Sequence, residues 1–82
     1  MDIESKIREY ISNNILFSDN GFPYPDEASF LQEGIVDSVG VLELVSFIED
    51  QMKVKVLDQE ITPDNFDSVQ KLASFVRTKQ AR

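Results

Sequence analysis

The first part of the chain carries apolar residues at helical spacing. Four isoleucines stand four residues apart, at Ile3, Ile7, Ile11 and Ile15. This spacing places them on one face of a helix, and Asp2 precedes them where an acid stabilises a helix N-terminus. The cluster Asp19-Asn20-Gly21 is typical of a turn, so we expect the helix to end before it.

Residues 38–52 give the clearest helical pattern in the chain. At 100° per residue, five apolar side chains gather on the face that is expected to contact the core: Val41, Leu44, Val45, Ile48 and Met52. After this helix, residues 53–56 alternate between lysine and valine too briefly to predict a strand.

Two further helix starts follow. Thr62-Pro63 combines an N-cap residue with proline at the first helical position and predicts a short helix. Asp67 and Gln70 stand in an arrangement close to a capping box, which predicts the start of the last helix. The last helix keeps the i, i+3, i+4, i+7 spacing of apolar residues to near residue 79: Val69, Leu72, Ala73 and Val76.

The segment from Leu16 to Asp37 shows no helical period. Pro23 and Pro25 exclude a regular helix, and Gly34 indicates a further turn. Its larger apolar residues indicate packing against the helices: Phe17, Phe22, Phe30, Leu31, Ile35 and Val36. Loops of this length in compact domains are uncommon and are usually functional. We therefore expect an ordered loop over the helices, with a short helical turn near residues 26–31.

These elements predict an all-α fold over residues 1–82. It is a small bundle of three main helices plus one short helix, with a long ordered loop between the first and second helices. A chain of 82 residues is long enough for one domain with a thin core. We also expect the protein to be a monomer.

The composition excludes several classes of function. With 15 acidic residues against 8 basic ones, the formal charge is −7, which argues against binding to nucleic acid. The chain has no His and no Cys, so zinc sites and thiol nucleophiles have no ligands or reactive groups. The acidic segments lack the spacing of an EF-hand. We expect no metal site and no enzymatic activity.

The hydropathy pattern shows neither a long apolar run nor a basic leader followed by an apolar segment. The first absence predicts no membrane insertion, and the second predicts no export signal. We therefore expect a cytoplasmic protein.

The acidic residues are concentrated in the middle of the chain. Residues 26–67 carry a net charge of −9, whereas the remaining residues carry +2. Such a distribution favours association with a basic partner surface. The alternative is a solvated acidic face that contributes only to solubility.

The helix predicted over residues 38–52 has an unusual solvent side. On the helical wheel, two apolar residues lie there among acids and a serine: Val39, Leu42, Glu43, Ser46, Glu49 and Asp50. An apolar centre with a charged rim is typical of a partner interface. We interpret these six residues as a docking face.

Ser38 is the first residue of this helix and follows Asp37 directly. Either side chain is a favoured N-cap, so both residues have a purely structural explanation. The functional alternative is that an exposed hydroxyl at a helix N-terminus suits a phosphodiester, because the helix dipole favours an anion there. From these two residues alone the structural explanation is preferred.

A longer stretch changes this preference. The segment Glu33-Gly34-Ile35-Val36-Asp37-Ser38-Val39-Gly40-Val41-Leu42-Glu43-Leu44-Val45 resembles the attachment segment of acyl carrier proteins. The segment Glu60-Ile61-Thr62-Pro63-Asp64-Asn65-Phe66-Asp67-Ser68 resembles their short third helix and its entry into the last helix. The resemblance extends from the first helix to Val76.

The resemblance implies specific roles for residues of the chain. Ser38 would receive a covalent 4′-phosphopantetheine cofactor from coenzyme A through a separate phosphopantetheinyl transferase, and Asp37 would help place that enzyme's metal. The terminal thiol of the arm would hold an acyl or aminoacyl cargo as a thioester. The acids of the docking face would bind basic patches on partners: a loading ligase and downstream synthase or transferase enzymes of fatty acid, polyketide or nonribosomal peptide biosynthesis.

The chain departs from the fatty-acid carriers at three positions. Val39 stands where many have Leu, Gly40 replaces a polar residue, and Ser46 replaces a larger apolar one. Gly40 either allows a partner to approach closely or is simply tolerated, and Phe47 is placed to shape an acyl pocket. These differences indicate a specialised freestanding carrier. The alternative function is a small acidic helical adaptor that binds a basic partner without a covalent group.

Overall fold

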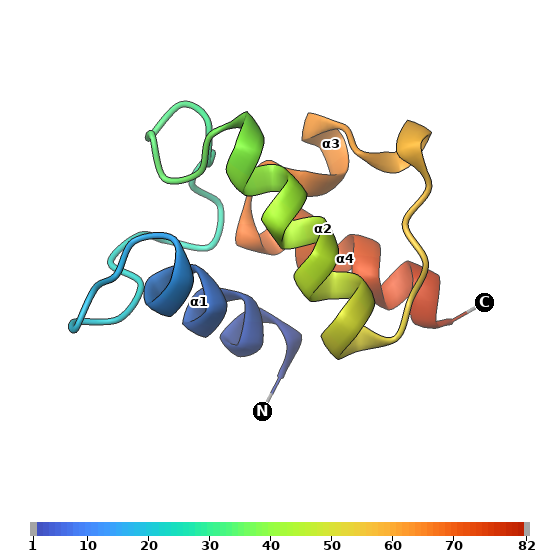
Figure 1. Ribbon diagram of the computed structural model, residues 1–82, viewed down its shortest axis with the longest axis horizontal. Helices are drawn as coiled ribbons and strands as arrows, with labels where there is room; N and C mark the ends of the chain where they lie inside the picture. The colour runs from blue at the N-terminus through green and yellow to red at the C-terminus, as the bar shows by residue number, and fades with distance from the viewer. Residues whose placement is uncertain (1, 82) are drawn as a thin grey trace.

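The computed structural model describes residues 2–81, and every regular element in that range is a helix (Figure 1). The elements in chain order are α1 (Ile3–Asn14), α2 (Ser38–Met52), the 3-10 helix η1 (Asp58–Glu60), α3 (Pro63–Phe66) and α4 (Val69–Gln80). This confirms the predicted bundle of three main helices and one short one. The 3-10 turn is an addition that the pattern did not predict.

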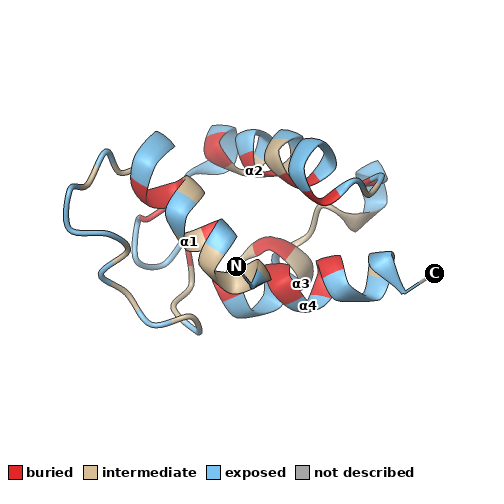
Figure 2. Ribbon diagram, turned by 90° about the horizontal axis from the view of Figure 1, so that it is seen from below, coloured by how far each residue is buried: buried red, intermediate tan, exposed pale blue. Residues whose placement is uncertain are grey.

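The core lies where the inward faces of α1, α2 and α4 meet, as the buried residues in Figure 2 show. Its fully buried helical side chains come from the predicted apolar faces: Ile7, Ile11, Leu44, Ile48, Val69, Leu72, Ala73 and Val76. Helix α1 packs along α4. It also contacts α2 through Tyr10 and Phe47, whose rings stack with their centroids 4.3 Å apart.

The helix starts follow local capping, with one exception to the prediction. Asp2 caps α1 by accepting a hydrogen bond from the Ser5 amide at 2.7 Å, as expected. For α4, however, the predicted cap by Asp67 is wrong. Ser68 is the N-cap and accepts from the Lys71 amide at 3.0 Å. The side chain of Asp67 turns instead toward the long loop.

The long loop between α1 and α2 is packed over the helices by part of its apolar set. Phe30, Ile35 and Val36 are buried, which confirms an ordered, packed loop. Phe17 and Leu31 are 79% and 52% exposed, so the prediction that these two side chains pack is wrong. Residues 26–27 and 30–34 form hydrogen-bonded turns, and the short helical turn expected near residues 26–31 does not form a helix.

Two backbone hydrogen bonds tie this loop to the corner between α3 and α4. The Phe30 amide donates to the Asp67 carbonyl at 2.7 Å, and the Gln70 amide donates to the Asp26 carbonyl at 3.0 Å. The Asp26 side chain also forms an ion pair with Arg8 of α1 at 2.7 Å. The loop is therefore fixed to both α1 and α4, and its last residues lead directly into α2.

Candidate functional site

Ser38 is the first residue of α2 and is exposed. Asp37 is the N-cap, and its Oδ1 accepts from the Gly40 amide at 2.8 Å. The Ser38 hydroxyl forms no hydrogen bond with any residue in the range 2–81. Of the two residues that could cap this helix, only Asp37 does so. Ser38 presents an unused hydroxyl at a helix N-terminus, where backbone amides and the helix dipole favour an anion.

Gly40 is buried in the first turn of α2. A Cβ at this position would lie 2.7 Å from Cγ1 of Val36 and 3.4 Å from Oδ1 of Asp37. The side chain that closely approaches Gly40 is therefore Val36 of the same chain. This differs from the expectation that Gly40 is simply tolerated or allows a partner to approach. The absence of a side chain lets the segment before Ser38 pack tightly onto the helix.

A groove of about 220 Å³ opens beside Ser38 between the long loop, α2 and the α3 region. Its walls are mostly apolar and comprise Leu31, Ser38, Val41, Leu42, Ile61, Thr62, Pro63, Phe66 and Asp67. The sequence interpretation assigned only Ser38 and Leu42 of these to a site. The helical wheel of residues 38–52 contains no information on which loop residue faces that helix.

The six residues of the predicted docking face all lie exposed on α2. Val39 and Leu42 are 65% and 60% exposed, so this apolar pair faces solvent. Around it stand the exposed residues Glu43, Ser46, Glu49 and Asp50. Of the three acids, Glu49 has a structural contact as well, because its Oε2 accepts from the Val56 amide at 3.0 Å.

Ion pairs engage three of the basic residues outside the acidic middle of the chain. Arg8 pairs with Asp26, Arg77 with Glu4, and Lys79 with Glu60, at 2.6–2.9 Å. The hydrogen bonds that Glu4 accepts from Arg77 lower the pKa of Glu4. The hydrogen bonds that Arg8 donates to Asp26 raise the pKa of Arg8.

By contrast, the acids of the docking face have no such neutralising partner. Within residues 2–81, none of Glu43, Glu49 and Asp50 forms an ion pair. Burial raises the pKa of the Tyr10 phenol, and the charge of nearby Glu43 adds to this rise. No cationic side chain of the described residues therefore compensates the acids of this face.

Phe47 was expected to shape an acyl pocket, but its ring stacks on Tyr10. It is not among the residues that line the groove beside Ser38. Phe47 therefore joins α1 to α2 and does not shape that groove.

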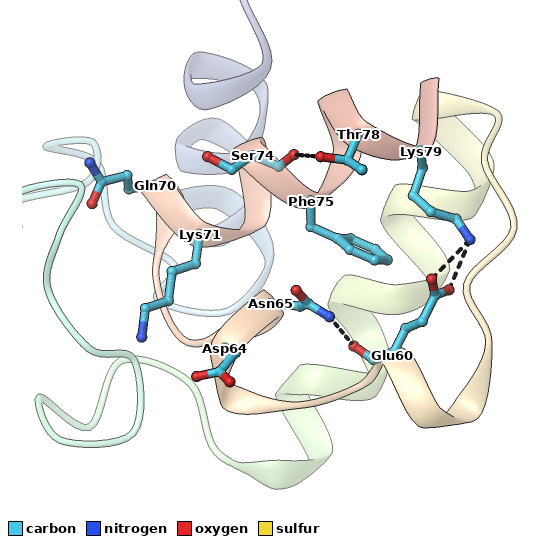
Figure 3. Close-up of a pocket in the computed structure, with 9 residues that line it drawn as sticks. All are labelled: Glu60, Asp64, Asn65, Gln70, Lys71, Ser74, Phe75, Thr78 and Lys79. Atoms are coloured by element: carbon cyan, nitrogen blue, oxygen red, sulfur yellow. Dashed lines mark hydrogen bonds and ion pairs between the residues drawn. The ribbon is translucent and has the colours of Figure 1, made fainter. Parts of the chain in front are cut away.

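A larger polar depression of about 440 Å³ lies between α3 and α4 (Figure 3). It is lined by none of the predicted site residues, and Lys79 spans its edge through an ion pair with Glu60. Among the described residues no group of three or more carboxylates suits a metal ion. None of the helices in residues 2–81 is long and apolar enough to cross a bilayer.

Comparison with known proteins gives one informative relative. No protein-family profile matches the chain. The chain is 30% identical over 79 residues to the probable acyl carrier protein PigG of Serratia sp. (strain ATCC 39006). The match covers 96% of this chain and 90% of PigG, so it extends over nearly the whole chain.

Proposed function

Because the chain belongs to the acyl carrier protein family, we propose that it carries acyl or aminoacyl intermediates on a 4′-phosphopantetheine arm attached to Ser38. Members of this family are carriers and not catalysts, so the protein is not an enzyme. Its part in the proposed function is to present a serine for modification and to dock on the enzymes that use the cargo.

The free hydroxyl of Ser38 is the observation that carries this proposal. If Ser38 were only a helix cap, its oxygen would accept an amide hydrogen bond of the helix. Asp37 makes that bond instead. The serine thus stands at the helix start without a structural partner among the described residues, and its substitution is expected to leave the fold intact.

The surroundings of Ser38 fit the proposed arm. The helix N-terminus stabilises the charge of a phosphodiester, and the apolar groove beside it suits the organic part of the arm. In the attachment step, the serine oxygen forms a bond to the pantetheine-side phosphorus of coenzyme A. The pyrophosphate bond breaks, adenosine 3′,5′-bisphosphate leaves, and the serine proton passes to solvent. When attached, the arm supplies a thiol for thioester chemistry, which a cysteine-free chain lacks.

The proposed partners follow from the surface around Ser38. A phosphopantetheinyl transferase, a loading ligase and the downstream synthase or transferase enzymes each have to reach the serine or its arm. Basic patches on these enzymes would meet Glu43 and Asp50, and apolar patches would meet Val39 and Leu42. The charge of the face increases the rate of association, which suits brief contacts with several cytoplasmic enzymes.

The test is the intact mass of the protein after incubation with coenzyme A and a broad-specificity phosphopantetheinyl transferase. We expect the parent chain to gain one phosphopantetheine and Ser38→Ala to gain none. Ser74→Ala is the matched control, because it removes an exposed hydroxyl from α4, outside the docking face and the groove beside Ser38, and is expected to be modified normally. Circular dichroism should show that all three chains are folded. A folded parent that gains no mass would refute the proposal and favour the acidic adaptor.

A further inference from the structure

Asp67 joins the α3–α4 corner to the long loop through its side chain as well as its backbone. Its carboxylate accepts from the Ser29 hydroxyl at 2.5 Å and from the Leu31 amide at 3.1 Å. Its carbonyl accepts from the Phe30 amide at 2.7 Å. Three consecutive loop residues are therefore held by one residue.

These hydrogen bonds determine the position of Leu31. The Leu31 side chain is half exposed, so burial alone does not fix it. It nevertheless lines the groove that Ser38 and Leu42 line from α2. Hydrogen bonds to a carboxylate are shorter and stronger than those between neutral groups. The Asp67 carboxylate thus holds an apolar side chain opposite α2 and beside the reactive hydroxyl.

We infer that Asp67 is a positioning residue that holds Leu31 as a contact for the transferase that modifies Ser38. The inference rests on the proposed function. An enzyme that brings its active site to the Ser38 hydroxyl has to cover the side chains that flank it. Leu42 flanks it on α2, and Leu31 flanks it on the loop. The docking face predicted on α2 therefore continues onto the long loop, where Asp67 sets its geometry.

Steady-state kinetics of the transferase with coenzyme A test this role. Leu31→Ala should raise the KM for the carrier about fivefold, as expected for one lost apolar contact. Asp67→Asn should raise it by no more than that, about twofold to fivefold, because an NH2 group replaces one of the two accepting oxygens and the charge that strengthens both hydrogen bonds is lost. The kcat should stay within about twofold in both, because Asp37 and Ser38 keep their places on α2.

The double variant tests whether Asp67 acts through Leu31. If it does, Asp67→Asn combined with Leu31→Ala raises the KM no further than Leu31→Ala alone. The matched control is Asp64→Asn, which makes the same charge change at an exposed position of α3 and should leave the KM unchanged. Ser29→Ala removes one donor without changing the charge, and it replaces Asp67→Asn if that variant fails to fold.

Amide hydrogen exchange gives a second measurement on the same chains. Asp67→Asn should speed exchange of the Leu31 amide about tenfold and leave that of the Gly40 amide, which is bonded to Asp37, unchanged. A parental KM in Asp67→Asn, or effects that multiply in the double variant, would overturn the inference alone. A parent chain that is not modified at all would overturn the proposed function, and this inference with it.

Discussion

Replacing Gly40 by alanine should destabilise the protein, although alanine is the better helix former. In an exposed helix this change stabilises by about 1 kcal/mol. Here the new Cβ would lie 2.7 Å from Cγ1 of Val36, which is itself 2% exposed and has little room to move. Forcing an extra carbon into a packed site costs about 1–3 kcal/mol. We therefore expect a net loss of about 1 kcal/mol.

Thermal and urea unfolding measure this difference. A loss of 1 kcal/mol should lower the Tm by about 4–8 °C in a chain of this size. Val36→Ala removes the carbon in question, so the double variant should be more stable than the sum of the two single losses by about 0.5 kcal/mol or more. A Gly40→Ala protein that is stabilised, or a double variant that is strictly additive, would show that Val36 does not restrict this position.

Two further predictions concern charge. Glu43→Gln should raise the KM of the transferase for the carrier about twofold to fivefold at low ionic strength and much less at about 0.5 M salt. The control is Glu9→Gln, the same change on the exposed surface of α1, which should leave the KM unchanged. Equal effects of the two variants would contradict the docking face. The Arg77 hydrogen bonds keep the folded pKa of Glu4 below its ordinary value of 4.5, so this contact stabilises the fold above that pH and is lost as the pH falls through the folded pKa. Urea midpoints at about pH 6 and pH 3 should therefore differ less in Glu4→Gln than in the parent, and an equal difference would exclude the pair as a source of acid sensitivity.

The helices and the candidate serine were largely predictable because both depend on near neighbours in the chain. Ile7, Ile11, Leu44 and Ile48 are buried where their spacing places them. The Thr62-Pro63 pair begins a short helix as expected. In each case the predictive signal is the spacing of residues within a few helical turns, so it can be read directly from the sequence.

The error at the start of α4 has a specific cause. Asp67 and Ser68 are both good N-caps, and local pattern does not choose between them. The structure assigns the cap to Ser68 because the Asp67 carboxylate is bonded to Ser29 and Leu31, which stand 38 and 36 residues earlier. Competition for one side chain between a local and a distant partner is decided by the tertiary fold.

By itself, the sequence determined the helical plan, the acidic face of α2, Ser38 as the candidate attachment residue and the resemblance to a family of carriers. Only the tertiary structure decided that Asp37 leaves the Ser38 hydroxyl free, that Gly40 admits Val36, and that Leu31 stands opposite α2 across the groove. The physical reason is range. Periodicity and candidate caps can be read from residues a few positions apart, whereas a groove wall is formed by side chains that meet only after the chain has folded.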